Sequence, residues 1–129
     1  MEYYISTKIK ISFEESMELV TEKLKEQGFG VLTEIDVKAT MKKKLDVDFY
    51  NYKILGACNP PLAHKALLAE DKIGVLLPCN VIIQEKEKGM VEVSAVNPIA
   101  SMQAVENPAL SDIAGEVTSR LKKVIDSLK

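Results

Sequence analysis

The chain has 129 residues, of which 47% are hydrophobic and 28% are charged, and its formal net charge is −2 at pH 7. This composition excludes a disordered chain, and the length suits one domain, which we place over residues 1–129. The slightly acidic balance excludes nucleic acid and an anionic membrane as the main partner. No apolar run approaches the ~18 residues of a membrane helix, and residues 1–4 lack a signal-peptide layout, so we expect a cytoplasmic protein.

The first third of the chain is predicted to form a strand, a helix and a second strand. Residues 3–11 alternate between two sets of side chains, which is the pattern of a half-buried strand. Ser12 and Glu15 have the spacing of a capping box, and apolar residues follow at helical spacing until Gly28 ends the helix. Residues 31–37 alternate again and predict the second strand.

The middle third combines strands with short helices. Residues 39–46 predict a short helix with three lysines on its solvent side, and residues 50–58 predict the third strand. Asn59, followed by two prolines, is a typical helix start. Residues 73–85 predict a long apolar strand. Pro78 interrupts it, because proline cannot donate to a strand ladder and therefore implies an edge or a bulge.

The last third begins with a hairpin and ends in helix. Residues 90–96 predict the strand that pairs with the preceding one, and Asn97-Pro98 and Asn107-Pro108 are further helix starts. The apolar stripe of the final helix consists of Leu110, Ile113, Ala114, Val117, Leu121, Val124, Ile125 and Leu128. The whole pattern predicts an α+β fold with a mainly antiparallel five-stranded sheet and amphipathic helices packed on one face.

The opposite face of this sheet is predicted to be partly apolar. We place on it, among polar residues, Leu32, Leu55, Ala57, Ile82 and Val96. A face with this many apolar side chains is more typical of a covered surface than of a solvated one. We therefore expect a homodimer that forms through this face.

The unusual chemistry of the chain is concentrated in two cysteine-asparagine pairs and one histidine. Cys58-Asn59 lies where a strand leads into a helix, and Cys79-Asn80 lies beside the expected bulge. These four residues are our candidate ligand-binding residues. Because backbone N–H groups at a helix start favour negative charge, Cys58 is also the candidate reactive thiol. With His64, the two cysteines form a candidate site for a soft metal.

A structural role for these residues is the alternative. Reduced cysteine is often buried as a small apolar side chain, and a single histidine on a short helix is more often at the surface than bound to metal. Three ligands are fewer than the four of a closed structural zinc site, and the Cys58-x5-His64 spacing matches no standard zinc pattern. Both interpretations stay open at the level of sequence.

One stretch resembles a known family. Gly56-Ala57-Cys58-Asn59-Pro60 and Gly74-Val75-Leu76-Leu77-Pro78-Cys79-Asn80-Val81, with Leu62-Ala63 and Ala66-Leu67 between them, are similar to domain-of-unknown-function family 302. The resemblance covers nearly the whole chain. It implies a compact α+β domain with an antiparallel sheet, often a dimer, and it implies no established activity. Cys58 and Cys79 lie in the similar blocks, whereas His64 belongs to the pattern less clearly.

Three hypotheses on function follow. The first is a small homodimeric module that binds a small molecule or a soft metal at Cys58, Asn59 and Cys79. The second is a thiol-based redox protein in which Cys58 is the reactive thiol. The third is a structural or partner-binding protein that uses the apolar sheet face. The residues indicate neither a particular reaction nor a particular cofactor.

Overall fold

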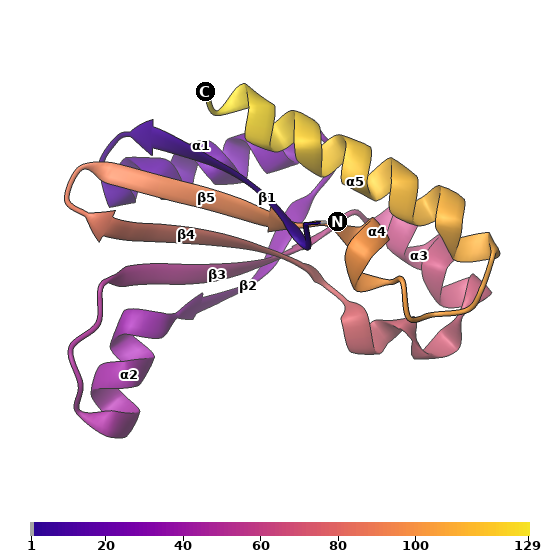
Figure 1. Ribbon diagram of the computed structural model, residues 1–129, viewed down its shortest axis with the longest axis horizontal. Helices are drawn as coiled ribbons and strands as arrows, with labels where there is room; N and C mark the ends of the chain where they lie inside the picture. The colour runs from indigo at the N-terminus through magenta and orange to yellow at the C-terminus, as the bar shows by residue number, and fades with distance from the viewer. Residues whose placement is uncertain (1) are drawn as a thin grey trace.

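The computed structural model describes residues 2–129. These residues fold around one antiparallel sheet (Figure 1). Its strands, in chain order, are β1 (Tyr4–Lys10), β2 (Gly30–Asp36), β3 (Asn51–Cys58), β4 (Cys79–Glu87) and β5 (Met90–Val96). Their order across the sheet is β1-β5-β4-β3-β2, and each neighbouring pair is antiparallel. The predicted fold class is confirmed.

All helices except α2 lie on one face or at one end of this sheet (Figure 1). They are α1 (Phe13–Glu26), α2 (Val37–Leu45), α3 (Pro60–Ala69), the 3-10 helix η1 (Asp71–Leu76), α4 (Pro98–Ser101) and α5 (Ala109–Ser127). Helices α1 and α5 cover one face, which we call the inner face, while α3, η1 and α4 gather near the beginning of α5 (Figure 1). Helix α2 projects away from the rest of the molecule between β2 and β3 (Figure 1).

The core lies between the inner face and the two long helices. Side chains with at most 1% exposure meet there, and they include Leu55, Val81, Ile83, Val91 and Val93 from the sheet and Val20, Leu24, Leu121 and Ile125 from α1 and α5. Burying each such side chain stabilises the fold by roughly 1.5–3 kcal/mol. The predicted apolar stripe of the last helix is thereby confirmed as a core stripe.

Helix α1 has the predicted ends. The Ser12 hydroxyl oxygen accepts a hydrogen bond from the Glu15 backbone N–H at 3.1 Å. At the other end, Gly28 has φ = 85°, its N–H donates to the Lys25 carbonyl, and the Phe29 N–H donates to the Leu24 carbonyl. These two bonds form a Schellman motif, which uses the left-handed conformation that glycine adopts without strain.

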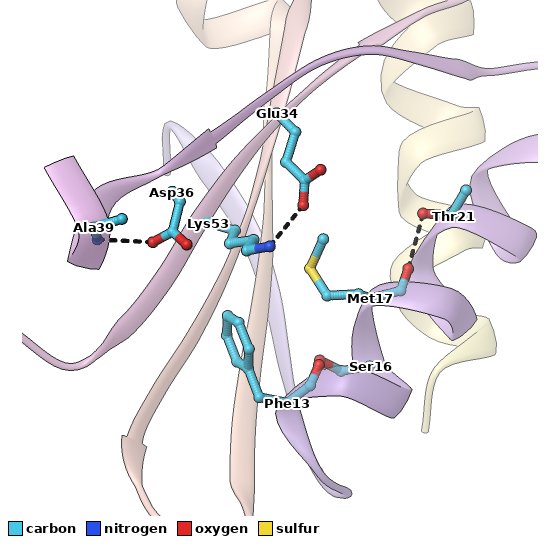
Figure 2. A network of polar contacts seen from close by, with 8 residues as sticks. All are labelled: Phe13, Ser16, Met17, Thr21, Glu34, Asp36, Ala39 and Lys53. Carbon is cyan, nitrogen blue, oxygen red and sulfur yellow. Dashed lines mark hydrogen bonds and ion pairs between the residues drawn. The ribbon is translucent and has the colours of Figure 1, made fainter.

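The inner face becomes polar at the end from which α2 projects (Figure 2). Lys53 of β3 and Glu34 of β2 form an ion pair at 2.8 Å, and the Asp36 carboxylate accepts the Ala39 N–H that begins α2. No residue of α2 is buried. Charged side chains on this face are thus kept at the end of the sheet opposite α3 and η1.

Two predictions about the sheet are wrong. Residues 73–77 are not a strand, because η1 occupies most of them and β4 begins only at Cys79. Pro78 carries no N–H, so the ladder begins after it rather than continuing through it. Leu55 and Ala57 do not lie on the open face: both are 1% exposed on the inner face, where they pair with Val81 and Cys79. In the described part of the chain, no helix is long and apolar enough to cross a membrane.

Candidate functional site

A cavity of about 300 Å³ lies where the ends of β3 and β4 meet α3, η1 and α5. Its walls are mostly aliphatic and aromatic side chains. The lining residues are Phe29, Leu32, Ala57, Cys58, Asn59, Leu62, Ala63, Ala66, Leu67, Gly74, Leu77, Pro78, Cys79, Met102, Ile113, Ala114 and Val117. Leu32 and Leu67 are 66% and 42% exposed, so they mark the mouth of the cavity.

The strand register brings both cysteines to this cavity. Cys58 is the last residue of β3, Cys79 is the first residue of β4, and Ala57 pairs directly with Cys79. The two residues are far apart in sequence, but antiparallel pairing places the end of one strand beside the beginning of the next. Cys58, Asn59 and Cys79 therefore line a common cavity, which the sequence left open.

The side chain of Asn59 makes two hydrogen bonds at the wall of the cavity. Its side-chain oxygen accepts the Leu62 N–H at 3.3 Å, which caps α3, and its Nδ2 donates to the Gln27 carbonyl at 3.4 Å. Arg120 of α5 donates to the same carbonyl at 3.1 Å. The side chain of Asn59 thus joins the start of α3 to the end of α1, and Arg120 adds α5 to the junction.

The two thiols are free and have different surroundings. Cys79 is 8% exposed, whereas Cys58 is half-buried. Burial raises the pKa of the Cys79 thiol to about 11, and the neighbouring Cys58 adds to this effect. At neutral pH, Cys79 is therefore protonated, and it contributes a small, polarisable and nearly apolar surface.

His64 does not join the cysteines. It is exposed on α3 and does not line the cavity, since Leu62 and Ala66 occupy the buried side of that helix. Across residues 2–129 there is no group of three or more His, Cys, Asp or Glu side chains that could hold a metal ion. The predicted metal-binding trio of Cys58, Cys79 and His64 is therefore not formed.

Asn80 lies on the other side of the sheet. Successive strand residues point to opposite faces, so Cys79 faces the cavity and Asn80 faces the open side. There it lines a shallow hollow of about 450 Å³. The hollow is lined by Tyr3, Tyr4, Tyr52, Asn80, Ile82, Gln84, Lys86, Glu92, Ser94, Ala95 and Val96. The structure thus separates Asn80 from the other three candidate residues.

Part of the cavity lining is not apparent from the sequence. Met102, and Ile113, Ala114 and Val117 of α5, line the cavity together with the cysteines. In the sequence, the three α5 residues belong to the same helical stripe as the core residues further along α5, such as Leu121 and Ile125. The spacing of a stripe shows which side of a helix is apolar, but it does not show where the packing leaves a space.

The fold and the cavity together define a small α+β domain with an apolar cavity at one end of its sheet. The family model described as "Domain of unknown function DUF302" matches residues 5–128, and the chain belongs to this family. The crystal structure of an uncharacterised conserved DUF302 protein from Bacillus stearothermophilus is similar over 100% of both chains, with a TM-score of 0.91 and 28% identity. No curated protein matches the chain.

Proposed function

We propose that this protein is a small-molecule-binding module whose ligand occupies the cavity beside Cys58 and Cys79. The observation that carries the proposal is the cavity itself. Its volume of about 300 Å³ is at the lower end of the range of ligand pockets, which are typically concave and mostly apolar. A concave apolar surface of this kind lets a small molecule bury most of its own surface.

The packing around the cavity supports this proposal. Its outer wall is formed by α3 and η1, and several large apolar side chains of this wall remain exposed, including Leu68 at 75% and Val75 at 84%. The opposite wall belongs to β3, β4 and α5, which are continuous with the main core. The cavity thus lies between the main core and an outer wall that exposes apolar side chains to solvent.

The experiment is a chemical-shift titration of ¹⁵N-labelled protein with a panel of small aromatic compounds, both uncharged and ionised. We expect at least one compound to shift the amide signals of residues such as Ala63, Ala66 and Ala114. Ala63→Phe should abolish these shifts because its ring fills the space, whereas Ala39→Phe, on the exposed surface of α2, should preserve them. A panel that leaves the signals of the lining residues unchanged would overturn the proposal.

We also propose that the protein is a homodimer formed through the open face of the sheet. Large side chains remain exposed on this face and at its edge, including Tyr3 at 72%, Tyr4 at 39% and Ile35 at 49%. The face also carries Ile82 and Val96. Exposed tyrosine and aliphatic side chains beside polar ones are typical of protein interfaces.

The thiol-based alternative depends on Cys58. Cys79 is buried and protonated at neutral pH, so a nucleophilic role would fall to Cys58, which is half-buried in the wall of the cavity. This alternative predicts that the two thiols react at unequal rates.

A further inference from the structure

We infer that the cavity selects an uncharged, apolar molecule about as large as two fused aromatic rings, and that it rejects ionised molecules of the same shape. This inference rests on the proposed function and gives its ligand a chemical class. It follows from the side chains in the wall, from their existing hydrogen bonds and from the volume of the cavity.

The wall offers no partner for a charge. Within residues 2–129, no Asp, Glu, Lys, Arg or His side chain lines the cavity. An ionised group that enters an apolar site loses its hydration, and it binds only if a charge or several hydrogen bonds replace that hydration. Cys79 cannot supply an opposing charge, because its thiol is protonated at neutral pH. A carboxylate or an ammonium group would therefore be excluded from the cavity.

Among the described residues, the one side-chain amide that lines the cavity is that of Asn59, and it is hydrogen-bonded within the fold. Asn59 is 6% exposed, its oxygen caps the Leu62 N–H, and its nitrogen donates to the Gln27 carbonyl. Each of the two atoms thus has one partner in the fold, and a ligand could reach only the second N–H of Nδ2 or the second lone pair of the oxygen, on a side chain that is 6% exposed. A ligand with several polar groups would therefore leave most of them without a partner among the lining side chains, at a cost in binding free energy.

The remaining heteroatoms in the side chains of the lining residues are sulfur atoms. Cys58, Cys79 and Met102 are lining residues, and their side chains carry two thiols and a thioether. Sulfur is polarisable and a weak hydrogen-bonding atom, and it makes favourable contacts with aromatic rings. The lining therefore favours a flat, apolar ring system over a hydrogen-bonding ligand.

The nearest charged cluster belongs to a different surface. Lys65, Asp112, Glu116 and Arg120 line a separate hollow between α3 and α5, which shares Asn59, Leu62 and Ile113 with the cavity. Arg120 pairs with Glu116 at 2.9 Å and also donates to the Gln27 carbonyl. Its hydrogen-bonding groups are thus engaged in the junction of α1, α3 and α5 rather than directed at the cavity.

The volume sets the size of the ligand. An apolar cavity of about 150 Å³ accommodates benzene, and this cavity is about 300 Å³. Two fused rings therefore fit, while a larger polycyclic molecule would have to displace the wall or extend out through the mouth. The mouth between Leu32 and Leu67 is itself apolar, so the route into the cavity matches its interior.

The test uses three probes that share a ring system and differ in charge: 1-methylnaphthalene, 1-naphthoate and 1-naphthylmethylammonium. Each is titrated at pH 7 into the full chain, and binding is followed by the amide signals of the lining residues. We expect 1-methylnaphthalene to bind with a Kd at least tenfold lower than that of either ion. Ala63→Phe should remove this binding, and Ala39→Phe should leave it unchanged.

The possible outcomes separate the inference from the proposed function. If either ion shifts the cavity signals at concentrations equal to or below those of 1-methylnaphthalene, the selectivity is overturned and the binding function stands. If none of the three probes shifts these signals, or if Ala63→Phe retains the shifts, the inference and the binding function are both overturned.

Discussion

At the scale of single residues, two similar cysteines acquire different properties from their positions. Cys58 ends β3 and Cys79 begins β4 beside the same cavity, and each is followed by asparagine in the sequence. Cys79 is buried in the main core cluster, whereas Cys58 keeps part of its surface accessible. Reactivity toward an alkylating agent depends on access and on the thiolate fraction, so the two thiols should be distinguishable.

We expect iodoacetamide to modify Cys58 at least tenfold faster than Cys79 in the folded protein at pH 8. Burial limits access to Cys79 and raises its pKa to about 11, so little of it is thiolate at this pH. Peptide mass mapping at successive times measures both rates, and Cys79→Ser should leave the rate at Cys58 nearly unchanged. Equal and slow modification of both thiols would eliminate the thiol-based alternative.

The raised pKa of Cys79 also predicts a pH dependence of stability. The thiol titrates near 9.0 when unfolded and near 11 when folded, so the folded state holds its proton more tightly. This contribution is fully present below pH 9 and is lost as the pH rises through 11. Its size is about 2–3 kcal/mol, because each unit of pKa difference corresponds to about 1.4 kcal/mol.

Urea denaturation at pH 8 and at pH 10.5 measures this effect. The free energy of unfolding of the wild type should fall more between these pH values than that of Cys79→Ala, which has no thiol to ionise. The difference between the two proteins isolates Cys79 from the groups that both proteins share. Parallel decreases in both proteins would contradict the assignment.

At the scale of secondary-structure elements, one junction positions the cavity wall. Gly28 follows the end of α1, and the Gln27 carbonyl beside it accepts hydrogen bonds from Asn59 and Arg120. Gly28 has φ = 85°, and a Cβ atom added there would lie 2.9 Å from Asn59 Nδ2. The end of one helix thus fixes the beginning of another, and with it the position of Cys58 and Asn59.

Gly28→Ala should lower the free energy of unfolding by about 1–3 kcal/mol, because alanine is strained at a positive φ and its Cβ crowds Asn59. Gly30→Ala is the matched control: it lies two residues away at the start of β2, and an added Cβ meets nothing within 4 Å. Urea denaturation should place Gly30→Ala close to the wild type. A Gly28→Ala variant as stable as the control would show that the junction tolerates a side chain.

Local sequence patterns predicted helix ends and apolar helix sides, but they did not predict which face of the sheet each strand residue occupies. Caps and long periodic stripes, such as those of α1 and α5, depend on neighbouring residues along the chain, and they were predictable. The consecutive apolar residues from Ile54 to Ala57 have no clear alternation, so their faces could not be assigned without the strand register. Residues 73–77 are equally apolar, yet residues 73–76 belong to η1, and the strand begins only after Pro78, which cannot donate to the ladder.

At the scale of the whole molecule, the two faces of the sheet have different partners. The inner face is covered by α1 and α5 (Figure 1), whereas the open face carries a hollow with tyrosines at its walls. Ser94 lies in this hollow and is 6% exposed, so larger neighbours surround a small residue there. The proposed dimer would place the same hollow of a second copy against this one.

Ile82→Lys should convert the dimer to a monomer, because it places an ammonium group in the middle of the open face. Light scattering coupled to size-exclusion chromatography should then give a mass near 14.3 kDa instead of about twice that value. Leu68→Lys, at a 75% exposed position on α3, is the control and should remain dimeric. A wild type that is already monomeric, or an Ile82→Lys variant that stays dimeric, would contradict the proposed interface.

By itself, the sequence determined the fold class, the ends of α1, the apolar side of α5 and the concentration of unusual chemistry between residues 56 and 81. These features depend on residues that are close along the chain, so local patterns report them. Tertiary structure decided that Cys58 and Cys79 share a cavity, that His64 and Asn80 are excluded from it, and that α5 forms one of its walls. These outcomes depend on strand register and on the space left by packing between distant segments, which no local pattern of residues contains.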